Sequence, residues 1–116
     1  MKSFKEAIVW QKSYKLTLFI YRITAQFPRA EEFGLKSQLR RAAVSLISNF
    51  AEGFKRISYK ERIQYYKMSE GSLEEIKCQT ELCKDLGYLS LKIYGQLEVL
   101  EEEVGRLLWR WISVQK

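Results

Sequence analysis

Residues 38–56 read QLRRAAVSLISNFAEGFKR, and this stretch decides the fold class of the chain. Its apolar residues recur at spacings of three and four, which is the periodicity of one face of an α-helix. That face holds Leu39, Ala42, Ala43, Leu46, Ile47 and Phe50. We therefore predict an amphipathic helix that runs from about Leu35 to Gly53, or one turn further.

Two further helices are defined by their end signals. The first runs from about Lys5 to Phe27, because the residue before Pro28 avoids the helical region. The other opens at the capping box Ser58-Tyr59-Lys60-Glu61 and stops near Gly87, since glycine suits the position after a helix. Burial over a wide arc of the first helix is predicted by two apolar stripes, Ala7, Trp10, Tyr14, Leu18 and Tyr21 on one side and Leu16, Ile20, Ile23 and Phe27 on the other.

A heptad seam predicts the fourth helix, which opens near Ser90. The seam consists of Ile93, Leu97, Leu100, Val104, Leu107 and Trp111. No segment shows the apolar alternation of a strand between turn signals. Because short links between long helices make neighbours antiparallel, we expect an all-α, antiparallel up-and-down four-helix bundle that forms a single domain over residues 1–116.

The composition disfavours an enzyme. The 116 residues are 47% hydrophobic and 29% charged, which argues against disorder, and they include no histidine. Its absence removes the usual zinc, di-iron and haem ligand sets and every Ser-His or Cys-His nucleophile pair. Cys78 and Cys83 would point about 140° apart on one helix, so we expect two reduced thiols. We expect no catalytic residue, no metal and no cofactor.

The N-terminus lacks the apolar core of a signal peptide, and no stretch approaches 18 uninterrupted apolar residues. We therefore expect a soluble, cytoplasmic protein that does not contact a membrane.

Positive charge is concentrated in the first part of the chain. Residues 1–67 carry a net charge of +9 and residues 68–116 carry −3, which together give +6. Such a surplus favours a polyanionic partner, although a solvated surface or the attraction between neighbouring subunits would also account for it. Tyr59, Tyr65 and Tyr66 lie among the basic residues and could stack on bases, although tyrosines at helical spacing are more often core. The candidate nucleic-acid-binding residues are Lys12, Lys15, Arg22, Arg40, Arg41, Lys55, Arg56, Lys60, Arg62 and Lys67.

A row of small polar residues lies opposite the apolar face of the second helix. Serine and asparagine are poor residues for a helix that only faces solvent, so this row is expected to press against something. We favour a polar seam with another helix or subunit over a phosphate site, because Glu52 would repel phosphate unless an arginine neutralises it. The row consists of Arg41, Ser45, Ser48, Asn49, Glu52, Gly53 and Arg56.

The end of the fourth helix indicates self-association. If Trp111 continues the heptad seam, Trp109 faces away from it, on the same side as Gly105 and Leu91. An outward tryptophan beside a glycine usually marks a contact surface, although a frayed last turn would expose it as well. We assign Leu91, Gly105 and Trp109 to an oligomer interface.

The run QLRRAAVSLISNFAEGFKR resembles the bacterial 23S rRNA intervening-sequence family of four-helix-bundle proteins. The resemblance covers nearly the whole chain and includes Trp10, Phe27-Pro28, Phe33-Gly34-Leu35, Gly71-Ser72-Leu73-Glu74-Glu75 and Leu86-Gly87-Tyr88-Leu89. Ile47 stands where the family is expected to have proline, so the second helix should be straighter here. Residues 103–108 and the tryptophan-rich end also resemble, over a short match, the accessory variability determinant of diversity-generating retroelements.

The family resemblance implies a ring-like homopentamer for which nucleic-acid binding is the usual proposal. Our first hypothesis is a non-enzymatic homo-oligomer that binds RNA or DNA mainly through phosphate contacts. The second is a protein-interaction scaffold, such as an accessory subunit of a reverse transcriptase. A small enzyme would need a site built without histidine or a metal cluster.

Overall fold

The computed structural model describes all residues, 1–116, and is entirely helical. Its four α-helices are α1 (Ile8–Thr24), α2 (Leu35–Lys55), α3 (Tyr59–Asp85) and α4 (Leu91–Ser113). Two short 3-10 helices, η1 (Phe4–Glu6) and η2 (Arg29–Glu31), precede α1 and α2. The prediction of an all-α chain with four helices and no strand is confirmed. None of the helices is long and apolar enough to cross a membrane.

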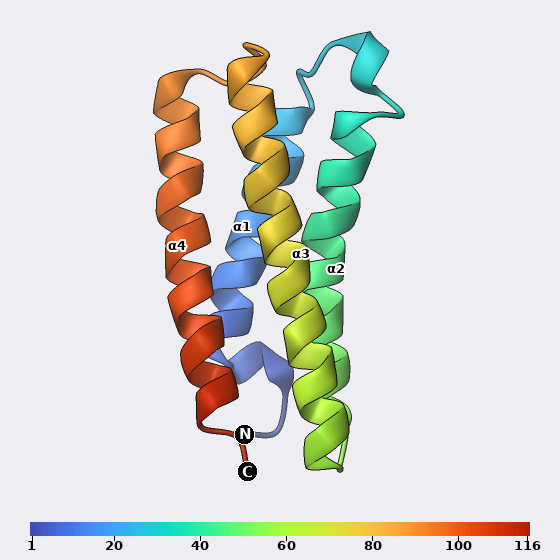
Figure 1. The fold of residues 1–116 in the computed structure, drawn as a ribbon, viewed down its shortest axis with the longest axis vertical. Coiled ribbons are helices and arrows are strands. Elements are labelled where there is room, and N and C mark those ends of the chain that lie inside the picture. Colours follow the sequence, from blue (N-terminus) through green and yellow to red (C-terminus); the bar gives the residue numbers. More distant parts are fainter.

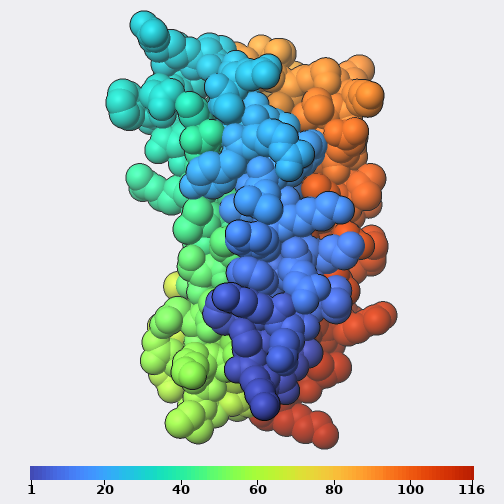
Figure 2. Space-filling view, turned by 180° about the vertical axis from the view of Figure 1, so that it is seen from behind, coloured from blue at the N-terminus to red at the C-terminus, as the bar shows by residue number.

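Each helix packs against the next one along the chain, and α4 also packs against α1 (Figure 1). The contact between α2 and α3 is the most extensive, and the molecule measures 43 × 25 × 20 Å. Both chain termini lie at the same end as the turn between α2 and α3. Seen from behind, α1 lies in the middle of the surface with α2 and α4 on either side (Figure 2).

One face of each helix contributes to the core. Its fully buried large side chains include Leu16, Ile20, Leu39, Leu46, Phe50, Tyr66, Ile76, Leu97 and Leu108. Small hydroxyl side chains are buried beside them and donate to backbone carbonyls. Thr17 donates to the carbonyl of Ala43 at 3.2 Å, and Ser69 donates to that of Leu46 at 2.8 Å. These hydroxyls are satisfied without a charged partner, so they allow helices to approach closely inside the core.

The predicted end signals of α3 and α4 are present. The Ser58 hydroxyl accepts from the backbone N–H of Glu61, and the Ser90 hydroxyl accepts from that of Ile93. Gly87 has φ +81° after the last residue of α3, and the N–H groups of Gly87 and Tyr88 bond back to the carbonyls of Lys84 and Cys83. This is the Schellman arrangement, in which glycine occupies the left-handed position.

The predicted limits of the first helix are wrong at both ends. Ala7 has an extended backbone (φ −77°, ψ 125°), which separates η1 from α1. At the other end α1 stops at Thr24, three residues before Phe27. Phe27 is buried against Tyr88 with ring centroids 5.5 Å apart, so the chain leaves the helix early to place this side chain in the core.

One of the two stripes predicted for the first helix is buried only at its start, where Ala7 is fully buried and Trp10 packs against the core. Tyr14, Leu18 and Tyr21 are exposed on the outer surface of α1. The positions that face the core beside Leu16 and Ile20 hold Ser13, Thr17 and Thr24 instead, whose hydroxyls bond to backbone carbonyls. Beyond Trp10, the apolar periodicity of this stripe therefore pointed to the wrong side of the helix.

Helix α2 is continuous from Leu35 to Lys55 through Ile47, which is half-buried.

Cys78 is exposed and Cys83 is buried, and the two are not bonded to each other. Burial raises the pKa of the Cys83 thiol to about 11.

Candidate nucleic-acid interface

The fold gathers the basic surplus at one end of the bundle. The chain segments at the end that holds both termini and the α2–α3 turn are residues 1–6, 52–67 and 106–116, which we call the basic end (Figure 1). They contain ten of the 20 Lys and Arg residues but three of the 14 Asp and Glu residues, a net charge of +7. The other 83 residues carry −1. The positive charge is therefore concentrated at one end of the long axis of the bundle, and the rest of the molecule is close to neutral.

Most of these cations have no carboxylate partner within 4 Å. Arg56 is the exception, because its guanidinium lies 2.7 Å from the Glu52 carboxylate. Arg62 donates to the backbone carbonyls of Ile57 and Lys116, which ties the α2–α3 turn to the C-terminus. The basic residues of this end are Lys2, Lys5, Lys55, Arg56, Lys60, Arg62, Lys67, Arg106, Arg110 and Lys116.

Arg56 stabilises the α2–α3 contact. Its guanidinium carbon lies 5.1 Å from the centroid of the Tyr65 ring, and it donates to the Tyr65 hydroxyl at 3.3 Å. The hydrogen bond with Glu52 raises the pKa of Arg56 above its ordinary value. This pair also neutralises the Glu52 carboxylate, which would otherwise repel phosphate.

The aromatic residues of the basic end divide into exposed and buried ones. Tyr66 is only 1% exposed and packs against Phe50 and Trp111, so it is a core residue that cannot stack on a base. Tyr59 and Ile57 lie exposed in and beside the α2–α3 turn, with Ile57 95% exposed. They offer an apolar contact among the lysines of the turn.

Five of the sequence-predicted basic residues lie away from this end. Lys12 of α1 is 3.7 Å from the Glu103 carboxylate of α4. Lys15 and Arg22 are exposed on α1, and Arg41 is exposed on α2. The ten candidates therefore do not form one patch. The five that are brought together are Lys55, Arg56, Lys60, Arg62 and Lys67.

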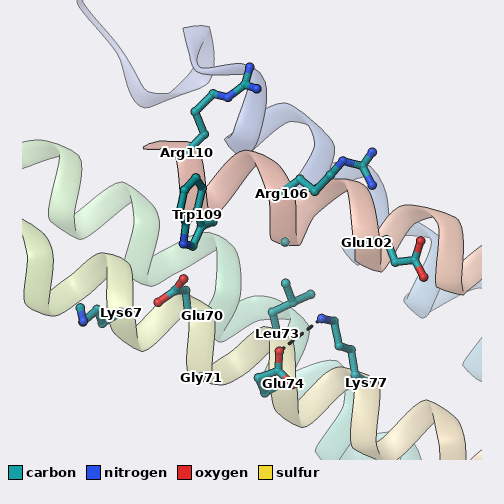
Figure 3. Close-up of a pocket in the computed structure, with 11 residues that line it drawn as sticks. Lys67, Glu70, Gly71, Leu73, Glu74, Lys77, Glu102, Arg106, Trp109 and Arg110 are labelled. Carbon is teal, nitrogen blue, oxygen red and sulfur yellow. Dashed lines mark hydrogen bonds and ion pairs between the residues drawn. The ribbon is translucent and has the colours of Figure 1, made fainter. Parts of the chain in front are cut away.

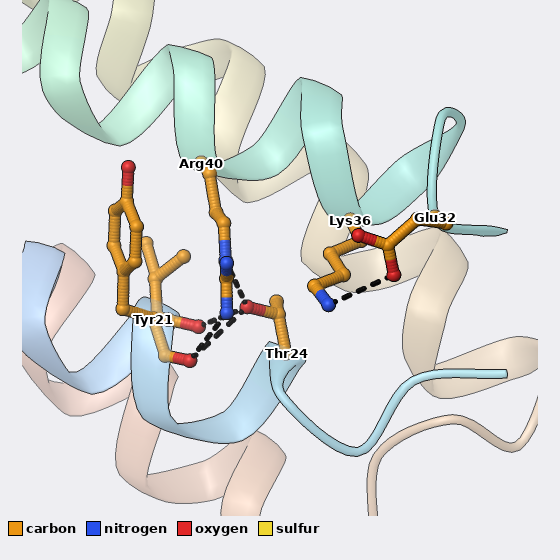
Figure 4. Close-up of polar contacts among 6 residues, drawn as sticks. Tyr21, Thr24, Glu32, Lys36 and Arg40 are labelled. Carbon is orange, nitrogen blue, oxygen red and sulfur yellow. Dashed lines mark hydrogen bonds and ion pairs between the residues drawn. The ribbon is translucent and has the colours of Figure 1, made fainter. Parts of the chain in front are cut away.

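The guanidinium of Arg40 is engaged by contacts between α1 and α2 (Figure 4). Its Nε donates to the Thr24 hydroxyl at 2.9 Å, and one terminal nitrogen donates to the Tyr21 carbonyl at 3.0 Å. Its guanidinium also lies over the Tyr21 ring, 4.5 Å from the centroid. A cation at the last carbonyls of α1 interacts favourably with the helix dipole, so this arginine joins α1 to α2.

The polar row of the second helix is divided between a seam and the surface. The Ser45 hydroxyl lies 2.8 Å from the Ser72 hydroxyl of α3 and also accepts from Asn49. Gly53 is buried where α2 meets α3, and an added Cβ would lie 2.8 Å from the Tyr66 ring. Arg41, Ser48 and Glu52 are exposed.

The three residues assigned to an oligomer interface do not form one cluster. Gly105 and Trp109 line a groove of about 1040 Å³ between α3 and α4, and Trp109 is 67% exposed (Figure 3). Leu91 is also exposed but lies at the other end of α4. The groove walls include Gly71, where no atom lies within 4 Å of an added Cβ.

No group of three His, Cys, Asp or Glu residues is arranged to hold a metal ion.

The carboxylic acid with the most perturbed ionisation is Glu101, which is 4% exposed and packs between α3 and α4. Burial raises its pKa to about 7, against the effect of the Thr80 hydroxyl 2.8 Å away. Lys77, Glu98 and Glu81 act on it electrostatically.

The family model of the 23S rRNA-intervening sequence proteins matches residues 5–110. The chain belongs to the family of 23S rRNA-intervening sequence proteins. Among solved structures it is similar to a protein of unknown function from the S23 ribosomal protein family of Bacteroides thetaiotaomicron. The two are 21% identical, with a TM-score of 0.81 over 90% of this chain and 98% of the other, which supports the same fold. The search of curated proteins gave no match.

Sequence reasoning missed half of the basic end of this 23S rRNA-intervening sequence protein. Lys2, Lys5, Arg106, Arg110 and Lys116 lie far from the α2–α3 turn in sequence and join it only through the fold. The signal that could have found them is the up-and-down order expected for the helices, which places both termini beside the second turn.

Proposed function

We propose that this protein is a non-enzymatic, homo-oligomeric nucleic-acid-binding protein, built on an up-and-down bundle, that contacts RNA or DNA mainly through phosphates. The observation that carries the proposal is the basic end, with a net charge of +7 against −1 for the rest of the chain. A surface of one sign attracts a polyanion and raises its association rate.

The chemistry of the basic end favours phosphate contacts over base reading. Lys55, Lys60 and Lys67 are exposed and have no carboxylate partner, so their ammonium groups can turn toward a phosphate. Arg56 and Arg62 are held by hydrogen bonds within the protein and support the turn that carries these lysines. Phosphate contacts position a protein without reading bases, so we expect weak dependence on sequence.

Assembly would multiply this contact. We propose a ring-like homo-oligomer, with five subunits following from the family resemblance, in which each copy presents one basic end. Several weak phosphate sites on one particle bind a long strand much more tightly than one site does. The exposed Trp109 beside Gly105 supports self-association.

The family name supports RNA as the first ligand to test, because it connects these proteins with intervening sequences of 23S rRNA. Binding of labelled RNA and DNA should be measured by filter retention at two ionic strengths. We expect both to bind, with an affinity that falls steeply as salt increases, because each phosphate contact releases counterions. Absent or salt-insensitive binding would contradict the proposal and favour the scaffold hypothesis, in which a protein such as a reverse transcriptase contacts the nucleic acid.

A further inference from the structure

A pocket between α1 and α4 has an apolar floor and a cationic rim. Phe19 of α1 and Leu100 of α4 are partly buried and pack against the core, and Val99 is an exposed apolar residue beside them. The cavity has a volume of about 390 Å³ and lies on the face where α1 and α4 are side by side (Figure 2). The rest of its lining consists of exposed polar side chains, those of Lys15, Arg22 and Gln96.

The charge of this pocket is positive. No carboxylate lines it, and α1 contains no acidic residue. Glu103, one turn beyond the pocket on α4, lies 3.7 Å from Lys12 and is therefore already paired, while Glu98 lines the cavity between α3 and α4. Lys15 and Arg22 have no carboxylate within 4 Å. Two unpaired cations at one pocket favour an anionic ligand.

The two cations lie on either side of the apolar floor. Lys15 and Arg22 are two turns apart on α1, about 10 Å along the helix, and Phe19 lies between them. The Arg22 guanidinium carbon is 5.8 Å from the centroid of the Phe19 ring. A nucleotide within a strand has the same order, because its base is attached to a sugar that lies between two phosphates. A fatty acid carries its one charge at the end of the chain and would leave one cation unpaired.

The side chains of the pocket suit an unpaired base. Aromatic rings and arginine guanidinium planes are the surfaces on which bases of single strands stack, and the pocket has one of each in Phe19 and Arg22. The Gln96 amide can both donate and accept, so it can bond to the edge of a base. The cavity volume of about 390 Å³ is near the lower end of the range for ligand pockets, which suits one base with its sugar.

One strand can reach both the basic end and this pocket. Helix α1 begins at Ile8, next to the N-terminal segment of the basic end (Figure 1). Phe19 lies about 16 Å further along the same helix. A strand whose phosphates contact the basic end can therefore continue along the face formed by α1 and α4 to the pocket.

We infer that the α1–α4 pocket binds one unpaired base of a single-stranded nucleic acid, and that Lys15 and Arg22 contact the phosphates on either side of it. The base stacks on Phe19 and lies against Val99 and Leu100. In a duplex the bases are paired and stacked on one another, so the pocket selects single strands. This inference rests on the nucleic-acid binding in the proposed function and names the class of nucleic acid.

Two pocket variants test the inference. Phe19→Leu removes the ring without changing the charge, and Lys15→Gln combined with Arg22→Gln removes the two cations. The control combines Arg29→Gln with Arg41→Gln, which removes the same charge at exposed positions outside the pocket and the basic end. Circular dichroism verifies that each variant is folded. Lys15 and Arg22 are exposed, so their double variant keeps the test decisive if Phe19→Leu lowers stability.

Fluorescence anisotropy should compare three labelled RNAs, namely a short single strand, the same strand without bases, and the duplex of the same sequence. We expect the wild type and the control to bind the intact strand about tenfold more tightly than the abasic one, because stacking stabilises the bound base. Each pocket variant should bind the intact strand about tenfold more weakly than the control does, and the other two RNAs as the control does. A wild type that binds none of the RNAs would overturn this inference together with the proposed function. Equal binding of the intact and abasic strands by the wild type, or pocket variants that bind the intact strand as the control does, would overturn this inference alone.

Discussion

At the scale of single residues, Gly53 is required by the approach of α2 to α3. An added Cβ would lie 2.8 Å from the Tyr66 ring and 3.0 Å from the Tyr65 Cβ. We expect Gly53→Ala to lower the free energy of unfolding by about 1–2 kcal/mol, because overpacking costs more than the gain in helix propensity. Thermal unfolding measures this change.

The matched control is Gly95→Ala in α4, where no atom lies within 4 Å of an added Cβ. That change should stabilise the protein by about 0.5–1 kcal/mol through helix propensity alone. If both alanines stabilise the protein, the contact between Gly53 and Tyr66 does not determine the helix spacing.

Arg40 joins two helices, whereas its neighbour Arg41 lies on the surface, so substitutions of the two should differ in their effect on stability. Arg40 makes two hydrogen bonds to the end of α1, so Arg40→Ala should cost about 1–2 kcal/mol of stability. Arg41 is exposed, so Arg41→Ala should change stability by less than about 0.5 kcal/mol. Denaturant titration compares the two, and equal losses would refute the assignment. The sequence alone does not distinguish the roles of the two arginines, because only the fold places Arg40 over Tyr21.

At the scale of helices, Glu101 makes the α3–α4 contact depend on pH. Burial raises its pKa in the folded state to about 7, above the value near 4.3 of an unfolded chain. The folded state therefore binds the proton more tightly, and this contribution to stability is present at low pH and is lost as pH rises from about 4.5 through 7.

Glu101→Gln tests this linkage because it preserves the shape and removes the titration. Stability should be measured by denaturant titration at pH 5 and pH 8. We expect the wild type to lose about 1–3 kcal/mol more than the variant between these two values. An identical pH profile for both proteins would mean that Glu101 does not titrate in this range.

End signals predicted the helices better than apolar stripes did. Ser58, Gly87 and Ser90 fixed the limits of α3 and α4, because capping depends on residues next to each other in sequence. The end of α1 depends on where Phe27 packs, and its buried face uses hydroxyls of Ser13, Thr17 and Thr24. Tertiary packing decides both, so periodicity did not reveal them.

At the scale of the whole molecule, the positive charge of the folded chain gathers in a different set of residues from the one that the sequence indicated. Along the sequence the positive part is residues 1–67, whereas in space it is the end that joins both termini to the α2–α3 turn. Lys55 and Lys60 could be predicted as neighbours because they flank one turn. Lys2, Arg110 and Lys116 could not, because the topology of the bundle brings them there.

The most direct test of the account measures RNA binding by two variants that lose equal charge. One variant carries Lys55→Ala and Lys60→Ala at the basic end, and the other carries Arg29→Ala and Lys92→Ala near the opposite end; all four positions are exposed. Fluorescence anisotropy over a salt series should show about tenfold weaker binding and a shallower salt slope for the first variant, and near wild-type binding for the second. Equal losses in both variants would contradict the central claim that the basic end is the binding surface.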